Sequence, residues 1–370
     1  MPATERLKGV AINLGAPHHL DHLAPMCEIT EIPFLFIEEK LYEAARHYYP
    51  HVQSHLVPYE ELTPEYLIRH YDVIFMSDYW DRKTFRQQYQ SLEEKYHKTM
   101  RQVHCPHGFS DKGFYLMLCA YEDIALVYGQ NMLDQFKHFG VYDELHSYVL
   151  TGNYRYTYFQ QQRDFWMPLV EKEVFSRFAR QQPTILYAPT WRDSEDSTSL
   201  FSAHASLLGQ LPDHYNMVVK LHPLIEEVDP IEYYKLLGLY EDKGNILFVK
   251  DFHPVYPLLA KADLYIGDMS SISYDFLIFN KPMFFLNTNA RDSQNDRGLY
   301  IFRCGVEILP EQFLQLYQLI ESSLPHDAKR FAQVRRETYA YTFGRERSFA
   351  EIRADVIKAC NAPDKFVSAM

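Results

Sequence analysis

Short apolar segments alternate with longer amphipathic segments along the first part of the chain. The apolar segments are typical of buried strands, and the segments between them repeat with the period of a helix. Parallel strands need a crossover connection, usually a helix, so the alternation predicts a doubly wound α/β domain over roughly the first 155 residues. The predicted strands are Gly9–Leu14, Ile32–Ile37, Val73–Met76, Arg101–His104, Ile124–Tyr128 and Tyr148–Leu150, and the predicted helices are Glu39–Tyr48, Lys83–Lys98 and Gln130–Phe139.

A helical segment over residues 160–182 leads into a second alternating series. Because single cores usually stop growing at ~250–300 residues, we expect two Rossmann-like lobes facing across a cleft. The predicted domains are residues 1–158, residues 159–345, and a terminal helix over 346–370 that packs back on the first lobe. The second series contains the strands Thr184–Ala188, Met217–Leu221, Ile246–Val249, Leu264–Ile266 and Met283–Leu286, and the helices Leu200–Leu208, Ile231–Leu237, His253–Lys261, Ile272–Phe279, Glu311–Ser322, Asp327–Tyr341 and Ser348–Cys360.

The stretch Ala262–Asn287 (ADLYIGDMSSISYDFLIFNKPMFFLN) has the pattern of one complete strand–turn–helix–strand unit. Ligands of parallel sheets bind where the first strand of such a unit meets its helix, and the first turn of the helix suits a phosphate group. Ser270 and Ser271 add hydroxyl donors there, and Asp275 could accept a hydrogen bond from a ribose or glycerol hydroxyl. The structural alternative is that Asp268 or Ser270 caps the helix.

The composition excludes several classes of protein. A net charge of −12 argues against a nucleic-acid binder, which normally has a basic face. No apolar window reaches the ~18 residues of a membrane-spanning helix, and the N-terminal residues lack the apolar run of a signal peptide. We therefore expect a cytoplasmic protein, and the basic-rich run Arg330–Arg347 leaves peripheral contact with the cytoplasmic membrane face open. The cysteines have no metal-binding or disulfide spacing, so reduced thiols, no metal and no cofactor are expected; they are Cys27, Cys105, Cys119, Cys304 and Cys360.

Residues suited to ligand binding follow several predicted strands, each just beyond the C-terminal end of the strand. In an open α/β sheet these ends line the crevice where ligands bind. Four such coincidences are harder to dismiss than one. The residues are His107, Thr190–Arg192, His222 and Asp268–Ser271.

His107 lies in the tight turn Cys-Pro-His-Gly and is a candidate general base. An imidazole can accept a proton from an attacking hydroxyl near neutral pH, and Gly108 lets the backbone approach a substrate closely. The alternative is a loop histidine without a catalytic task, as most of the 17 histidines must be.

Cationic side chains also follow the strands of the second series. Strand alternation puts Lys220 and His222 on one face at the end of the predicted strand Met217–Leu221, and both could contact phosphate oxygens. Arg192 is a candidate for binding a diphosphate with its planar guanidinium, and Arg297 in the late Asp-Arg-Gly loop is a weaker one. The alternative for each is a solvated strand end or loop.

Six segments follow one another in the order of a known family: His107–Gly108, Gly152–Arg155, Tyr187–Asp193 (YAPTWRD), Lys220–Pro223 (KLHP), Gly267–Phe285 and Asp296–Tyr300 (DRGLY). Taken together, they resemble the CDP-glycerol glycerophosphotransferase family of teichoic-acid primases and polymerases. The resemblance covers about residues 100–305, and the first hundred residues can be matched to the family only by their position in the chain. Two features depart from the family pattern: Pro106 and Phe109 flank the His-Gly pair, and Asn153–Tyr154 precedes Arg155.

The resemblance implies a GT-B fold in which the C-terminal lobe holds most of the CDP-glycerol donor and the N-terminal lobe serves the acceptor. It also implies that His107 is the base and that His222 assists at the phosphate. Peripheral action at the cytoplasmic membrane face is a further implication. The substrate-binding residues that it implies or that the strand ends suggest are Gly108, Arg155, Thr190, Arg192, Lys220, Asp268, Ser270, Ser271, Asp275 and Arg297.

The function expected is transfer of glycerol-phosphate, or a related polyol-phosphate, from a CDP-activated donor to an acceptor hydroxyl in cell-wall or capsule polymer synthesis, with release of CMP. The acceptor could be a polyol-phosphate chain, a lipid-linked saccharide or a capsular sugar, and the oligomeric state stays open. Three alternatives are a GT-B glycosyltransferase with a nucleotide-sugar donor, a nucleotide-binding relative without catalysis, and a sugar-nucleotide epimerase that needs no acceptor.

Overall fold

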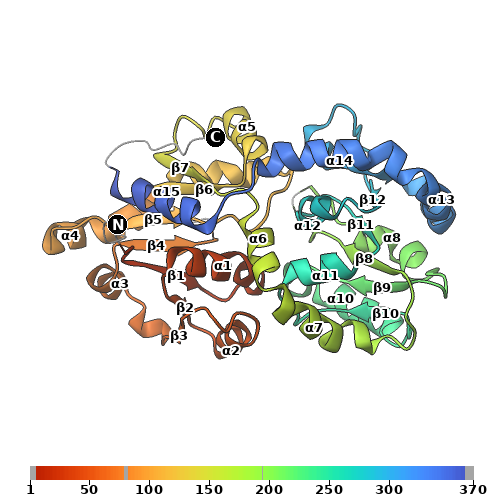
Figure 1. The fold of residues 1–370 in the computed structure, drawn as a ribbon, viewed down its shortest axis with the longest axis horizontal. Helices are drawn as coiled ribbons and strands as arrows, with labels where there is room; N and C mark the ends of the chain where they lie inside the picture. Colours follow the sequence, from red (N-terminus) through yellow and green to blue (C-terminus); the bar gives the residue numbers. More distant parts are fainter. Residues whose placement is uncertain (1–5, 79–81, 194, 363–370) are drawn as a thin grey trace. The chain divides into compact units, whose positions relative to one another are not determined.

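The computed structural model describes residues 6–78, 82–193 and 195–362, and it divides the chain into two compact units (Figure 1). The first unit runs to Phe109, resumes over Gly113–Tyr158 and includes the chain from Tyr341 onward. The second unit comprises Phe159–Ala340 together with the short segment Ser110–Lys112. Residues 1–5 and 363–370, at the ends of the predicted first and last domains, lie outside the described residues.

The first unit is built on a parallel sheet with the strand order β3-β2-β1-β4-β5-β6-β7 in the described part of the chain. From β3 to β6 this is the order of the dinucleotide-binding Rossmann sheet, in which the order reverses between β1 and β4. The strands are β1 (Gly9–Asn13), β2 (Phe34–Phe36), β3 (Ser54–Leu56), β4 (Val73–Met76), β5 (Arg101–His104), β6 (Ile124–Val127) and β7 (Ser147–Leu150).

Helices cover both faces of this sheet, which is why most of its strands are apolar without alternation. On one face, Val10 and Ile12 of β1 pack with apolar residues of α3 and α4. On the other face, α1 packs against β1 and β2, and α15 packs against β7 and α1. The helices are α1 (Leu20–Thr30), α2 (Glu39–Tyr48), α3 (Pro64–His70), α4 (Arg82–Tyr96), α5 (Gln130–His138), α6 (Tyr154–Gln161) and α15 (Phe349–Asn361).

The second unit is built on a parallel sheet with the strand order β10-β9-β8-β11-β12-β13 in the described residues. This is again the Rossmann order, with the reversal between β8 and β11. The fold class predicted from the sequence, α/β with two Rossmann-like lobes, is confirmed for each unit. The strands are β8 (Thr184–Ala188), β9 (Asn216–Val219), β10 (Ile246–Phe248), β11 (Leu264–Gly267), β12 (Met283–Leu286) and β13 (Val306–Ile308).

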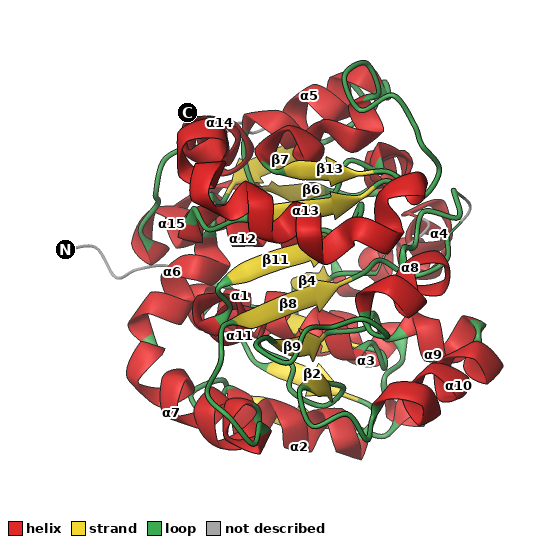
Figure 2. Ribbon diagram, turned by 90° about the vertical axis from the view of Figure 1, so that its right-hand side faces the viewer, coloured by secondary structure: helices red, strands yellow, loops and turns green. Residues whose placement is uncertain are grey.

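The core of the second unit lies between this sheet and the helices α8, α10 and α13. The helices α7 and α11 pack against each other, and α11 also packs against β8, on the opposite side from α8 and α10 in Figure 2. The helices are α7 (Arg163–Glu173), α8 (Leu200–Leu207), α9 (Leu224–Val228), α10 (Pro230–Tyr240), α11 (Val255–Lys261), α12 (Ile272–Phe276), α13 (Leu316–Ser323) and α14 (Asp327–Phe343), of which α14 passes into the first unit at Tyr341.

Several predicted helices differ from the structure, among them Ile272–Phe279, which is α-helical only to Phe276 and continues as a 3-10 turn. The segment 160–182 is not one helix, because α6 ends at Gln161, α7 ends at Glu173 and a 3-10 turn follows. The segment Glu311–Ser322 begins as a 3-10 helix and becomes α-helical only at Leu316. Pro310 at the first position of that turn fixes its backbone dihedral and lacks an N–H donor, which suits a helix start.

All five cysteines are buried free thiols. Cys304 lies in the second unit and the other four lie in the first. Burial raises the pKa of the Cys105 and Cys304 thiols to about 11 and that of Cys360 to about 12. Burial also raises the pKa of Cys27 and Cys119 well above the usual value, so all five thiols stay protonated at neutral pH.

Within the part of the chain that the structure describes, every helix is too short or too polar to cross a membrane.

Candidate active site

Three neighbouring strands of the first unit, β1, β4 and β5, carry candidate residues just beyond their C-terminal ends. His18 and His19 follow β1 in a short 3-10 helix (Pro17–His19), Asp78 follows β4, and His107 follows β5. Because these strands are parallel and adjacent, their carboxyl ends meet at one edge of the sheet, next to the point where the strand order reverses. Ligands of open α/β sheets bind at such points.

His18, His19 and His107 form a compact group, which we call the histidine cluster. One ring nitrogen of each lies within 4.8 Å of one ring nitrogen of the other two. The ring centroids are 4.3 Å apart for His18 and His19, 4.8 Å for His19 and His107, and 5.4 Å for His18 and His107. Sequence reasoning selected His107 and missed His18 and His19, although the strand-end rule applied to Gly9–Asn13 would have found them.

The environment of His107 fixes both its protonation and its orientation. Burial lowers the pKa of His107, while a hydrogen bond to the Ser77 carbonyl opposes this effect. That bond is 3.0 Å long at Nδ1, and because a carbonyl oxygen only accepts, the ring proton sits on Nδ1. Nε2 therefore carries a lone pair that can accept a proton. Burial also lowers the pKa of nearby His104, to about 3, so that His104 stays neutral.

Gly108 and Arg155 support this region of the first unit in different ways. Gly108 has a φ of 114°, a left-handed conformation that favours glycine, so the turn after His107 depends on it. Arg155 is buried and pairs with the Asp21 carboxylate, and its Nε also donates to the Asp21 carbonyl at 3.2 Å. In this arrangement its guanidinium is engaged within the first unit, joining α6 to α1.

In the second unit, Asp268 holds the loop after β8 against the end of β11. Its carboxylate is buried and accepts a hydrogen bond from the backbone N–H of Thr190 at 2.8 Å. It also accepts from the backbone N–H and the hydroxyl of Ser199, both at 2.7 Å. Burial raises the pKa of Asp268, and these bonds together with the positive charge of Lys112 oppose the rise. Asp268 thus defines the shape of the loop that contains Thr190 and Arg192.

The segment Ser110–Lys112 adds two buried charges that sequence reasoning did not identify. Lys112 pairs with Asp193 at 2.5 Å and donates to the Thr190 hydroxyl at 2.7 Å. Asp111 accepts hydrogen bonds from the Tyr274 hydroxyl at 2.6 Å and from the Ile301 N–H at 3.0 Å. These contacts tie the segment to the loop after β8, to helix α12 after β11 and to the 3-10 helix Arg297–Cys304 after β12.

Arg297 is bound to the same segment. Its guanidinium contacts the Asp111 carboxylate at 2.6 Å, and this positive charge opposes the rise in the pKa of Asp111 that burial causes. Its side chain is 37% exposed, and its guanidinium also lies 4.4 Å from the centre of the Tyr300 ring.

Arg192 is the most accessible of the predicted diphosphate-binding residues, with 41% of its side chain exposed. Its guanidinium contacts Asp229 at 3.1 Å and Asp196 at 3.3 Å, and it lies 4.5 Å from the centre of the Phe201 ring. These contacts leave a planar cation at the surface of the β8 loop, as a diphosphate site requires.

Lys220 and His222 both lie beyond β9, because this strand ends at Val219 and does not continue to Leu221. The predicted shared strand face therefore does not exist. Lys220 donates to the Phe252 carbonyl at 2.8 Å. Nδ1 of His222 accepts from the backbone N–H of Leu224 at 3.2 Å, which leaves Nε2 of the neutral ring as a donor.

The predicted residues after β11 are partly buried within the fold. Asp275 is buried and accepts from the Tyr256 hydroxyl at 2.9 Å. The carbonyl of Ser270 accepts from the Ser273 hydroxyl at 2.6 Å, and Ser271 is half-buried at the start of α12. The capping role considered for Asp268 and Ser270 is not what their side chains do, since the N-cap position of α12 belongs to Ser271, without a side-chain cap bond.

The family model of CDP-glycerol:poly(glycerophosphate) glycerophosphotransferases matches residues 160–345, just over half of the chain. The chain belongs to this family. The match coincides closely with the second unit and includes the loops after β8, β9 and β11. His107 and Arg155 lie outside the matched residues.

Curated relatives of this glycerophosphotransferase-family chain are teichoic-acid enzymes by name. The teichoic acid glycerol-phosphate primase of Bacillus subtilis (strain 168) is 35% identical over 121 residues, which are 32% of this chain and 29% of the relative. The teichoic acid poly(ribitol-phosphate) polymerase of Bacillus spizizenii (strain ATCC 23059 / NRRL B-14472 / W23) is 23% identical over 201 residues, which are 53% of this chain and 30% of the relative. The chain therefore spans less than a third of the length of these relatives in each alignment.

Solved structures support the fold of this family member over nearly the whole chain. The wall teichoic acid polymerase TagF superposes with a TM-score of 0.61 at 14% identity, covering 96% of this chain and 90% of the other. The Anabaena protein HepE in complex with UDP-glucose has a TM-score of 0.52 at 11% identity, covering 95% and 98%. At these identities, the similarity establishes the two-sheet, GT-B-like fold.

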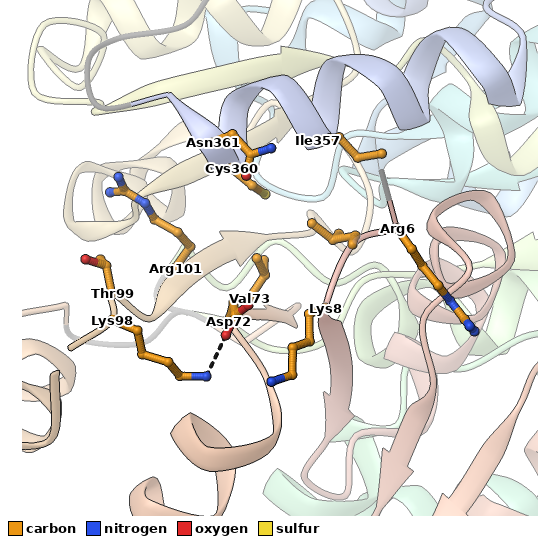
Figure 3. Close-up of a pocket in the computed structure, with 11 residues that line it drawn as sticks. Arg6, Lys8, Asp72, Val73, Lys98, Thr99, Arg101, Ile357, Cys360 and Asn361 are labelled. Carbon is orange, nitrogen blue, oxygen red and sulfur yellow. Dashed lines mark hydrogen bonds and ion pairs between the residues drawn. The ribbon is translucent and has the colours of Figure 1, made fainter. Parts of the chain in front are cut away.

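Figure 3 shows a pocket of about 360 Å³ in the first unit. The pocket lies at the N-terminal ends of the strands, whereas the histidine cluster lies beyond their C-terminal ends. Its lining includes Lys8, Asp72 and Arg101, which stand at the N-terminal ends of β1, β4 and β5. Lys98 contacts Asp72 at 2.5 Å inside it. Because ligands of Rossmann sheets bind at the C-terminal ends, this pocket is separate from the candidate active site.

Proposed function

We propose that this chain transfers glycerol-phosphate, or a related polyol-phosphate, from a CDP-activated donor to the hydroxyl of an acceptor and releases CMP. The product would be a cell-wall or capsule polymer, or its primer. The observation that carries this proposal is the match of the glycerophosphotransferase family to the second unit, with Thr190, Arg192 and His222 on its strand-end loops. The two Rossmann-ordered sheets support a nucleotide-linked donor.

In this proposal, His107 is the general base. Nε2 takes the proton of the acceptor hydroxyl, whose oxygen then forms a bond to the β-phosphorus of the donor. The bond between that phosphorus and the oxygen of CMP breaks, and CMP leaves with the electron pair. The hydrogen bond from Nδ1 to the Ser77 carbonyl supports this role, because it orients the ring and holds the ring proton on Nδ1.

The second unit would hold the donor and stabilise its charge. Phosphoryl transfer depends mostly on positioning and electrostatic stabilisation, which cations and hydrogen-bond donors supply. Arg192 and His222 would contact the phosphates, supported by Lys220 and Arg297, and Ser271 would donate from the β11 loop. Thr190 and Asp268 would shape the loop around the donor.

The remaining predicted residues would act through local structure. Gly108 would permit close approach of the backbone to the acceptor, and Arg155 would hold α6 to α1 behind the histidine cluster. Ser270 and Asp275 would support the β11 loop from inside the second unit. An acceptor on a lipid carrier would bring the chain into peripheral contact with the cytoplasmic membrane face, which sedimentation with acceptor-loaded vesicles tests.

The decisive experiment is phosphorus NMR of the purified chain with CDP-glycerol and a glycerol-phosphate primer, followed by CDP-ribitol and UDP-glucose as donors. We expect CMP release that depends on the primer. The variant His107→Ala should lower the rate by about 100- to 10 000-fold, the usual contribution of a general base. The exposed His51→Ala provides a matched control that should keep the full rate.

Release of UDP from UDP-glucose in place of CMP would replace the donor assignment with a nucleotide-sugar donor. Binding of CDP without turnover in any variant would indicate a relative that no longer catalyses. Equal rates for His107→Ala and His51→Ala would exclude His107 as the base.

A further inference from the structure

Two members of the histidine cluster, His18 and His19, have no part in the proposed transfer reaction. They are nevertheless close enough to His107 for all three rings to share one ligand, since a nitrogen of each lies within 4.8 Å of the others. The cluster is assembled from the ends of two different strands, β1 and β5, so the fold brings the three rings together across more than eighty residues of sequence.

We propose that His18, His19 and His107 bind a divalent transition-metal ion of the Zn²⁺ class. Imidazole nitrogens suit zinc, copper, nickel and iron, whereas Mg²⁺ and Ca²⁺ prefer oxygen ligands. Three histidines with one open position are a recurrent donor set for zinc. Zinc–nitrogen bonds of about 2.0–2.1 Å place the ligand atoms nearer to each other than 4.8 Å, so the rings must rotate inward by about an ångström.

The contacts behind the cluster resemble the outer partners of metal-bound histidines. Ligand histidines usually give their second ring nitrogen to a carboxylate or a backbone carbonyl. Nδ1 of His107 contacts the Ser77 carbonyl at 3.0 Å, and Nδ1 of His19 lies 3.7 Å from the Asp78 carboxylate. Ser77 and Asp78 both lie in the loop after β4, and strand β4 lies between β1 and β5 in the sheet.

The turn that carries His18 and His19 is held in place before any ion binds. The Asn13 side chain at the end of β1 accepts from the backbone N–H of Gly15 at 3.0 Å and of Ala16 at 2.9 Å. It also donates to the Ala16 carbonyl at 3.0 Å. A preformed turn lowers the conformational entropy lost on binding.

An ion in this site would occupy the Nε2 lone pair of His107, which the proposed function needs for a proton. This consequence rests on the proposed function: metal binding and base catalysis exclude each other, so Zn²⁺ should inhibit transfer reversibly.

The test is a titration of the untagged full chain with Co²⁺, a spectroscopic substitute for zinc. We expect one ion per chain, with visible absorption bands of a four-coordinate nitrogen site that disappear when Zn²⁺ is added. His18→Asn and His19→Asn should each weaken binding by at least about tenfold, and Asp78→Asn by about 10- to 100-fold. The exposed His214→Asn, on the second unit, is the matched control and should bind like the unaltered chain.

X-ray absorption of the zinc-loaded unaltered chain removes any dependence on how well the variants fold. A shell with three imidazoles supports the site, whereas a shell with sulfur or with a single imidazole overturns it. The absence of stoichiometric Co²⁺ binding, or equal affinity in His18→Asn and His214→Asn, also overturns it.

A second experiment tests inhibition by measuring the rate of CMP release with and without Zn²⁺. We expect inhibition that EDTA reverses and that needs at least about tenfold more Zn²⁺ in His18→Asn. Tight binding that leaves the rate unchanged would exclude His107 as a ligand and overturn the three-histidine assignment. If no CMP is released under any condition, the proposed function fails while the Co²⁺ spectrum still decides the metal site.

Discussion

Lys112 and Asp193 are two charged residues that the second unit has removed almost entirely from water. Their side chains are 4% and 0% exposed and approach to 2.5 Å. Asp193 also accepts from the Ser197 hydroxyl at 3.2 Å, and Lys112 donates to Thr190 at 2.7 Å. The attraction within a buried pair mainly offsets the cost of desolvation, so the pair adds little net stability, but the loss of one partner leaves the other charge uncompensated.

We therefore expect Lys112→Met to destabilise the second unit by about 3 kcal/mol, because Asp193 would keep its buried charge without a cation. Urea unfolding followed by circular dichroism measures the change. The replacement has a similar length and no charge, so lost packing contributes little.

The double variant Lys112→Met with Asp193→Asn provides the control through a double-mutant cycle. Since Asn cannot be charged, we expect the combined loss to be smaller than the sum of the two single losses by at least about 1 kcal/mol. Strict additivity would mean that the two residues do not form a coupled pair.

At the scale of one element, α15 shows how a helix start is built from its sequence. The Ser348 side chain accepts from the Glu351 N–H at 3.2 Å, and the Glu351 carboxylate accepts from the Ser348 N–H at 2.8 Å. Arg345 contacts the same carboxylate at 2.8 Å. These bonds satisfy N–H groups that the helix itself leaves unpaired.

The hydrogen bonds from Arg345 and Ser348 lower the pKa of Glu351 to about 2. The folded pKa is below the unfolded value, so the contribution of Glu351 to stability is complete above the unfolded pKa and is lost as the pH falls toward the folded one. We expect Glu351→Gln to lower the melting temperature at neutral pH and the difference to shrink below about pH 4. Exposed Glu346→Gln is the control, and a pH-independent difference for Glu351→Gln would contradict the assignment.

The local pattern of apolar and polar residues predicted most of the sheet strands. It missed the elements whose conformation depends on packing in the folded chain. The predicted bounds of β4, β5, β8 and β12 agree with the structure. Helix α1 was missed because ten of its eleven residues are buried, which removes the amphipathic period, and because Pro25 lies inside it. The edge strands β3 and β13 are only three residues long, too short for a period to be read.

The individual residues of the candidate site could be predicted from the sequence, but their grouping in space could not. Strand-end residues such as His107 and Arg192 follow from local sequence, because parallel strands present their carboxyl ends to a ligand. The grouping of His18 with His107, and of Lys112 with Asp193, depends on which strands and loops are neighbours in space. That order is a property of the whole sheet and has no local signal.

At the scale of the whole molecule, each of the two units has a core of its own. Ile352 on α15 is fully buried in the first unit, and Ile320 on α13 is fully buried in the core of the second. The chain therefore contributes to the first unit from both its beginning and its end.

This division predicts that a cavity created in one core lowers mainly the stability of the unit that contains it. Ile352→Ala should destabilise the first unit by about 2–5 kcal/mol, and Ile320→Ala should do the same to the second. Hydrogen exchange read by mass spectrometry should show faster exchange in β7 for the first variant and in β8 for the second. Equal acceleration in both sheets for either variant would mean that the two units unfold as one.

The buried thiols can report local unfolding of each unit. A thiol reacts with an alkylating reagent only as the exposed thiolate, so Cys105, Cys304 and Cys360 should be inert in the native protein. Each local unfolding event would expose these thiols to the reagent. The increase in protein mass with time, caused by alkylation, would then measure how often each region unfolds. Because Cys304 lies in the second unit, its labelling rate would time that unit separately, without any introduced probe.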